Sequence, residues 1–207
     1  MMKLTKRLLA LALTFAALTA SASDEADTLL DKVVEWTSAK GTVEVDYLLN
    51  SGGNSAAGTM AIDGKRFRVL SEVLDTWFDG TNQWSYSPST GEVTLSVPTD
   101  EELQQVNPFV IINAFRRHYT TALKPKEEGS KHRVVLLKPK DETADITRVE
   151  VSVPDGYLYP ARIVVWTSGG ETLAINTTRI IRGKKFSDSD FTYSKSIHPD
   201  AEIVDLR

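Results

Sequence analysis

The spacing of apolar residues along the chain predicts a large sheet with a few helices. From residue 43 onward, Val43, Val45, Tyr47 and Leu49 alternate with mostly polar neighbours, which is the period-two pattern of a half-buried strand. Short turns rich in Gly, Asn, Asp and Ser then separate further runs of strand length, and consecutive hairpins of this kind predict antiparallel meanders. These further strands are expected at residues 58–62, 66–70, 76–78, 83–86, 93–97, 133–137, 147–153, 157–167 and 171–181.

Aromatic residues in the first meander are expected to point into the molecule. Phe67 and Val69 share one face of their strand, while arginines occupy the other face. Trp84 and Tyr86 likewise share one face of their strand. The four side chains are therefore predicted to face a common interior.

Helical spacing occurs at two places in the pattern. Residues 24–40 place apolar side chains on one helical face, and Gly41 ends the run. In the middle of the chain, Thr99-Asp100 predicts the start of one helix, and Asn107-Pro108 predicts a second, with Asn as its cap and Pro at its first position. The economical architecture is mainly β with α: one large curved antiparallel sheet, an unclosed barrel whose concave face is covered by the helices. Residues 194–207 are expected to form an irregular tail.

The second central helix, Phe109–Phe115, is apolar on nearly every side. A helix lying on a sheet needs only one apolar stripe. Either this helix is buried all round in the core, or it covers an apolar cavity that holds a ligand. Ile112 is three residues from both Phe109 and Phe115, and it is the position expected to face such a cavity.

The N-terminus has the composition of a secretory signal peptide. Lys3, Lys6 and Arg7 precede an apolar run over residues 8–18, and Ala20-Ser21-Ala22 supplies small residues for cleavage. We therefore expect residues 1–22 to be removed and residues 23–207 to form a single domain. The chain of 207 residues has a net charge of −4, and loss of the three cations in that segment leaves −7. Such an acidic exported protein is a poor candidate for binding nucleic acid.

The sequence contains no catalytic constellation that we can identify. There is no cysteine, which excludes a disulfide framework, a thiol nucleophile, a thiolate metal site and lipid attachment to a cysteine after the signal. The histidines are scattered without metal-binding spacing, and Asp188 and Asp190 in a Ser/Asp-rich connection read as loop carboxylates rather than as an acid–base pair. The histidines are His118, His132 and His198. No enzyme activity, metal or cofactor is predicted, and the surplus of apolar residues indicates a carrier or binder of an apolar ligand.

Several short motifs resemble the LolA-type periplasmic lipoprotein carriers. The most telling is the Asp79-Gly80 hairpin followed by Trp84-Ser85-Tyr86. The others are Gly58-Thr59-Met60, Lys65-Arg66-Phe67-Arg68, Trp77-Phe78, Pro108-Phe109-Val110-Ile111-Ile112, Phe191-Thr192-Tyr193 and Pro199-Asp200-Ala201-Glu202-Ile203-Val204-Asp205. Their order and spacing span almost the whole mature chain.

The resemblance implies a monomeric periplasmic carrier that binds the acyl chains of lipoproteins or lipids and transports them from the inner to the outer membrane. It also implies an ATP-driven inner-membrane release complex as donor and an outer-membrane receptor as acceptor. The side chains expected to contact the ligand are Val45, Tyr47, Met60, Phe67, Val69, Trp84, Tyr86, Phe109, Ile112 and Phe115. Those expected to act in the lid and the hand-off are Asp63, Pro108 and Ile111.

One position departs from the family pattern. In the family, a Lys-Arg-Pro step before the equivalent of Phe67 supplies an arginine that helps to hold the lid closed and keeps transfer one-way. Here the stretch reads Ile62-Asp63-Gly64-Lys65, with Asp63 in place of that arginine. This departure implies a different hand-off.

Two other classes of function compete with the carrier. One is a regulatory module with the same half-barrel that binds a lipid or a misfolded lipoprotein and reports to a membrane partner. The other is a secreted enzyme acting on an apolar substrate, which would need a positioned acid–base pair.

Overall fold

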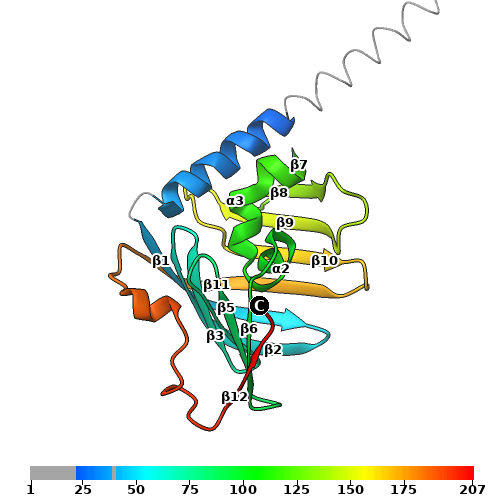
Figure 1. Cartoon of the computed structure of the whole chain (residues 1–207). Helices are drawn as coiled ribbons and strands as arrows, with labels where there is room; N and C mark the ends of the chain where they lie inside the picture. Colours follow the sequence, from blue (N-terminus) through cyan, green and yellow to red (C-terminus); the bar gives the residue numbers. More distant parts are fainter. Residues whose placement is uncertain (1–21, 39–40) are drawn as a thin grey trace, which may run out of the picture.

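The computed structural model of the chain describes residues 22–38 and 41–207 (Figure 1). Within this part the strands form one 12-stranded sheet with the spatial order β12-β6-β5-β4-β3-β2-β1-β11-β10-β9-β8-β7. The strands are β1 (Thr42–Ser51), β2 (Asn54–Asp63), β3 (Arg66–Ser71), β4 (Asp75–Phe78), β5 (Gln83–Ser87), β6 (Glu92–Ser96), β7 (Tyr119–Leu123), β8 (His132–Pro139), β9 (Ile146–Pro154), β10 (Arg162–Thr167), β11 (Thr172–Arg182) and β12 (Glu202–Asp205). Every neighbouring pair is antiparallel except β12 with β6, which is parallel. Since β7 and β12 are the edges and do not pair with each other, the predicted unclosed barrel is confirmed.

The sheet consists of two meanders joined along β1. Val45 of β1 is opposite Met60 of β2 on one side and Ile180 of β11 on the other. Gly52 and Gly53 form the turn between β1 and β2 with φ of 55° and 85°, a pair of left-handed conformations that glycine adopts without a steric penalty. The seam between β1 and β11 therefore connects the N-terminal and C-terminal halves of the chain.

Helices cover the concave face of the sheet, as expected. They are a helix over residues 22–38, α2 (Asp100–Val106) and α3 (Pro108–His118). Thr99 caps α2 in a capping box with Glu102, and the Asn107 side chain accepts a hydrogen bond from the backbone N–H of Phe109, so both predicted helix starts are confirmed. The N-terminal helix lies against α3, where Asp27 and Asp31 pair with Arg116 (Figure 1).

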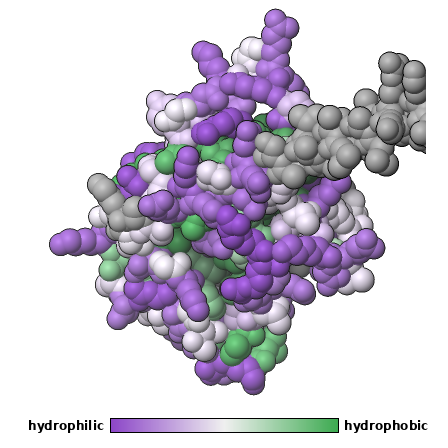
Figure 2. Space-filling model, turned by 90° about the horizontal axis from the view of Figure 1, so that it is seen from above, coloured by the Kyte–Doolittle hydropathy of each residue, from purple (hydrophilic) through white to green (hydrophobic). Residues whose placement is uncertain are grey.

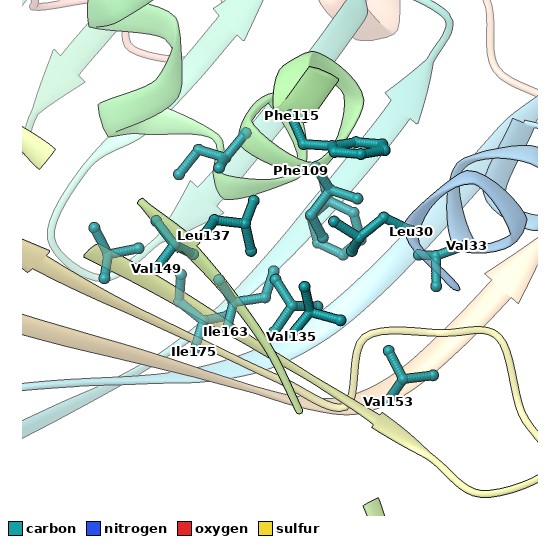
Figure 3. Close-up of a cluster of buried hydrophobic side chains, with 14 of the residues drawn as sticks. Leu30, Val33, Phe109, Phe115, Val135, Leu137, Val149, Val153, Ile163 and Ile175 are labelled. Carbon is teal, nitrogen blue, oxygen red and sulfur yellow. The ribbon is translucent and has the colours of Figure 1, made fainter. Parts of the chain in front are cut away.

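The main core lies between these helices and the sheet (Figure 3). Leu30 and Val33 from the N-terminal helix and Phe109 and Phe115 from α3 meet apolar side chains of the second meander. Those sheet residues include Val135, Leu137, Val149, Val153, Ile163 and Ile175. None of the described helices is both long enough and apolar enough to span a bilayer.

The C-terminal segment ends in a strand, so the prediction of an irregular tail over residues 194–207 is wrong for Glu202–Asp205. After β11 the chain crosses the convex face of the first meander, forms the 3-10 helix η1 (Asp188–Phe191) and ends in β12 beside β6 (Figure 1). It closes a second, smaller core with Trp77, Val93, Tyr193 and Ala201. β7 was also not anticipated, and the strand expected over residues 157–167 begins only at Arg162, because residues 155–161 form a turn that includes Pro160.

Candidate functional site

A cavity opens on the concave side between α2, α3 and the sheet, and we call it cavity A. Its volume is ≈ 370 Å³, within the range of about 300 to 1,000 Å³ that ligand pockets occupy. Its apolar walls are Tyr47, Leu49, Met60, Val106, Phe109, Ile146, Val165, Leu173 and Ile175. Its polar lining is Gln104, Asp145, Thr167, Ser168, Gly169 and Glu171. Figure 2 shows a hollow in which hydrophobic surface is exposed among hydrophilic side chains.

The wall of cavity A at Tyr47 depends on a glycine in the next strand. Tyr47 is opposite Gly58, and a Cβ added to Gly58 would lie 2.4 Å from both Cζ and Oη of Tyr47. Only glycine therefore lets the ring lie across β2 at this point. Burial raises the pKa of Tyr47, and the charge of Asp75 raises it further, so the hydroxyl stays neutral at physiological pH.

A second cavity, cavity B, lies on the other side of α2. Its volume is ≈ 470 Å³. Its apolar walls include Ile62, Phe78, Leu103 and Val110, and the tips of the β2–β3 and β4–β5 hairpins form part of its border. The remaining lining residues are Gly64, Lys65, Gly80, Thr81, Val97, Pro98, Asp100, Gln104, Asn107, Asn113, Ala114 and Arg117.

One buried side chain, Gln104 of α2, lies between the two cavities and lines both. Its Oε1 accepts a hydrogen bond of 2.6 Å from the hydroxyl of Tyr119, and its Nε2 donates to the backbone carbonyl of Asp100 at 3.2 Å. Burial, and secondarily the charge of Glu101, raises the pKa of Tyr119 to about 12. The hydroxyl therefore remains a donor to Gln104 at neutral pH, and it fixes α2 against the sheet.

The rims of the two cavities carry charges of opposite sign. Asp145 and Glu171 are the ionisable residues that line cavity A. Cavity B is lined instead by Lys65, Arg117 and Asp100. Arg117 and Asp100 form an exposed ion pair of 3.5 Å.

The structure places three of the predicted ligand-contacting residues at cavity A: Tyr47, Met60 and Phe109. Five others lie in the main core behind the cavity walls. These are Val45, Phe67, Val69, Ile112 and Phe115. Ile111 is also fully buried there, and Pro108 occupies the first turn of α3.

Ile112 therefore does not have the position expected of it. Its side chain is 2% exposed and packs in the core, whereas Phe109 faces cavity A and Val110 faces cavity B. Within Phe109–Phe115 the side of the helix at Asn113 is exposed. The three-residue spacing of Ile112 from Phe109 and Phe115 identified side chains of α3 that are buried in the core, and not those that face a cavity.

The inward orientation predicted for Trp84 and Tyr86 is wrong. Phe67 is opposite Phe78 and both belong to the main core, so Trp77 on the same strand as Phe78 faces the convex side. Trp84 is opposite Trp77 and therefore also faces outward, and Tyr86 follows by alternation. These aromatic side chains contact the C-terminal segment instead of the cavity.

Asp63 lies on the convex side, away from the helices. Its carboxylate pairs with the guanidinium of Arg66, which also contacts Asp188 of η1 and lies over the ring of Phe191. Asp190 accepts a hydrogen bond from Arg68 in the same region. The two carboxylates that are close in sequence, Asp188 and Asp190, thus bind arginines of β3 and fasten the C-terminal segment to the sheet.

Six of the apolar residues that line cavity A were not predicted from the sequence. They are Leu49, Val106, Ile146, Val165, Leu173 and Ile175. A signal was present for Leu49, which continues the alternation of Val45 and Tyr47. For the strands of the second meander, alternation identifies a buried face but does not distinguish core from cavity wall. Among the described residues, no cluster of three or more His, Asp or Glu side chains could hold a metal ion.

Comparisons with known proteins agree with this architecture. A family model described as outer membrane lipoprotein carrier protein LolA matches residues 14–165. No curated protein matches the sequence.

Solved structures with a similar fold have very different sequences. An uncharacterized conserved protein from Thermus thermophilus has a TM-score of 0.58 and 14% identity, with 87% of this chain and 99% of that chain covered. A DUF1329 family protein from Desulfovibrio piger has a TM-score of 0.53 and 12% identity, with 86% and 99% covered. A LolA superfamily protein from Nitrosomonas europaea has a TM-score of 0.46 and 14% identity, with 81% and 97% covered.

Proposed function

The chain belongs to the LolA family of outer membrane lipoprotein carrier proteins, and from that premise we propose that it binds the acyl chains of lipoproteins in cavity A and carries them from the inner to the outer membrane. Members of this family are periplasmic carrier or binding proteins. The observation that supports the carrier proposal most directly is an apolar cavity lined by Tyr47, Met60, Phe109 and Leu173 beneath a short helix.

The energetics favour such a cavity as a carrier site. Each methylene removed from water contributes about 0.8 kcal/mol, so a chain of roughly sixteen carbons cannot cross an aqueous compartment unaided. Cavity A offers apolar surface at its walls and polar groups such as Thr167 and Glu171 at its border. A chain could therefore be buried there while the attached polypeptide stays in water.

Release requires that part of the cover can move. We infer that α2 acts as the movable cover, because it is only seven residues long and separates the two cavities. Pro108 begins α3 after the Asn107 cap, and the buried Ile111 would hold this helix in place while α2 moves. Without an arginine at position 63, the hand-off cannot use a lid contact from that side chain.

Membership of the family supports a proposal about compartment and partners. We propose that the mature chain is a periplasmic monomer that receives its cargo from an ATP-driven inner-membrane complex and gives it to an outer-membrane receptor. Residues 1–22 would be the signal peptide that directs export.

The test places a charge in cavity A. Leu173 is half-buried at the cavity wall, so Leu173→Glu should leave the thermal melt cooperative and within a few degrees of the wild type, and should abolish binding of an acylated peptide. The matched control is Leu48→Glu, because Leu48 is 42% exposed and lies outside the walls of cavity A. Unchanged binding of the acylated peptide by a folded Leu173→Glu variant would refute the proposal.

Native mass spectrometry of the protein from its own periplasm distinguishes the carrier from the regulatory module. A co-purifying lipoprotein supports the carrier. Free lipid alone would point instead to a lipid-binding module.

A further inference from the structure

Cavity B combines apolar walls with a cationic border, and the proposed carrier function does not use it. Ile62 and Phe78 from the sheet face Leu103 of α2 and Val110 of α3 across it. These walls can bury a hydrocarbon chain. Cavity B is therefore a separate apolar compartment on the far side of α2 from cavity A.

The border of cavity B carries one uncompensated positive charge. Lys65 lies at the exposed tip of the β2–β3 hairpin and makes no ion pair within the described residues. Arg117 is balanced by Asp100, and both of these side chains are largely exposed. The Lys65 ammonium is thus available to a negatively charged group at the mouth of the cavity.

Two carboxylates near this hairpin, those of Asp63 and Asp79, form no ion pair with Lys65. Asp63 is engaged with Arg66 on the convex face of the sheet. In the adjacent β4–β5 turn, the Asp79 carboxylate accepts hydrogen bonds from the backbone N–H groups of Thr81 and Asn82. Neither carboxylate therefore contacts the Lys65 ammonium directly.

The contrast with cavity A determines which ligand each cavity suits. The carboxylates lining cavity A are those of Asp145 and Glu171, and the exposed Glu171 disfavours an anionic head group. Cavity B has the opposite balance, and the described lining residues of the two cavities have only Gln104 in common. The two sites are therefore chemically distinct.

We propose that cavity B is a second ligand site and that it binds an anionic amphiphile, with the acyl chain between the sheet and α2/α3 and the carboxylate or phosphate at Lys65. A fatty acid and an anionic lysophospholipid both supply this chemistry. The proposal does not depend on what cavity A carries.

The experiment titrates the mature protein with palmitate and, separately, with lysophosphatidic acid, using lysophosphatidylcholine as the zwitterionic control. We expect the anionic ligands to bind more tightly than the zwitterionic one at low ionic strength, and the preference to diminish with salt, because the Lys65 contact is exposed. Binding of palmitate alone identifies a fatty-acid site, and binding of lysophosphatidic acid alone identifies a phospholipid site. Equal affinity for anionic and zwitterionic ligands would overturn the proposal.

Variants then assign the binding to cavity B. Lys65→Gln should weaken anionic ligands by about fivefold at low salt, the effect of one exposed charge contact, whereas Lys131→Gln at another exposed lysine should not. Ala114→Trp should fill the cavity and abolish binding, while Leu173→Glu at cavity A should leave it intact. If Leu173→Glu abolishes palmitate binding and Lys65→Gln has no effect, the anionic ligand occupies cavity A and the proposal is wrong. If Ala114→Trp does not fold, the comparison of Lys65→Gln with Lys131→Gln still decides whether the anionic ligand binds at cavity B.

Discussion

A single residue, Tyr119, connects three elements around the cavities. Tyr119 caps the C-terminus of α3 through its backbone N–H and begins β7, and its side chain reaches Gln104 in α2. Both side chains are buried, so neither polar group can exchange its partner for water without a movement of α2. The stability of this contact sets how readily α2 separates from the sheet.

The Tyr119 hydroxyl gives a prediction about alkaline pH. Its pKa is about 12 in the folded protein and 10.0 for an unperturbed tyrosine, so its neutral form stabilises the fold fully below pH 10. That contribution should be lost as the pH rises from 10 to 12, because the unfolded chain releases the proton first. A shift of two pKa units corresponds to roughly 3 kcal/mol. This contribution is measured as the difference in the free energy of unfolding between wild type and Tyr119→Phe, obtained by urea denaturation at each pH from 10 to 12.

The phenylalanine variant is the reference for that measurement. At pH 7, Tyr119→Phe should cost about 1 to 3 kcal/mol, because the Oε1 of Gln104 loses its buried donor. The gap between the two proteins should then narrow above pH 10. Parallel stability profiles up to pH 12 would show that Tyr119 ionises as easily in the folded state as in the unfolded state.

Among the elements, the C-terminal segment covers the convex face of the first meander. Its aromatic side chains contact those of the sheet on the convex face: the ring of Tyr193 meets that of Trp77 edge-on with centroids 5.4 Å apart, and the ring of His198 is stacked on that of Tyr86 at 3.6 Å. The Tyr193 hydroxyl donates to the carbonyl of His198 at 3.2 Å. This segment supplies the second face of a sheet that would otherwise expose Trp77.

Tyr193→Ala should therefore destabilise the domain strongly. Tyr193 is 8% exposed, and loss of a buried aromatic side chain costs about 3 to 5 kcal/mol. Denaturant unfolding followed by tryptophan fluorescence checks this, since Trp77 reports on the same cluster. Tyr157→Ala is the control, because Tyr157 is 59% exposed and its loss should change stability by less than about 1 kcal/mol. Similar losses for the two variants would mean that the segment does not support the sheet.

The elements that sequence reasoning identified correctly are those with a local signal. Thr99 and Asn107 begin helices through contacts within a few residues, and the hairpin turns depend on residues adjacent to them. β12 has no such signal, because it is four residues long and is fixed by pairing with β6, more than a hundred residues earlier. The orientation of Trp84 was wrong for a related reason: it depends on cross-strand register with Trp77, which alternation within one strand does not determine.

For the molecule as a whole, the candidate site was predicted as a region rather than as a set of residues. The apolar surplus and the helix after Asn107 indicated a cavity beneath helices, and Tyr47, Met60 and Phe109 lie on its wall. The sequence could not indicate that α2 divides the concave space in two. That division depends on the meeting of Gln104 with Tyr119, a contact between elements.

The compartment gives a prediction at the same scale. The described structure begins with a helix at residue 22, and residues 1–21 lie outside the described residues. We expect the mature N-terminus near Ser23 and recovery of the protein in the osmotic-shock fraction. N-terminal sequencing of that fraction checks both points. Recovery in carbonate-washed membranes with the first residues intact would contradict them.

The seam between β1 and β11 has a consequence for the order of folding. Antiparallel neighbours within the first meander are joined by short turns. The second edge of β1, in contrast, can form its hydrogen bonds only with residues 173–182 of β11. An exported chain that emerges N-terminus first delivers β1 early and β11 late, so the first half of the sheet exists for a time with an open strand edge. Contacts of such long sequence separation slow folding, and the open edge is a site for pairing with other chains. A chaperone in the compartment where the chain folds that shields residues 42–51 until β11 has arrived would therefore protect this open edge.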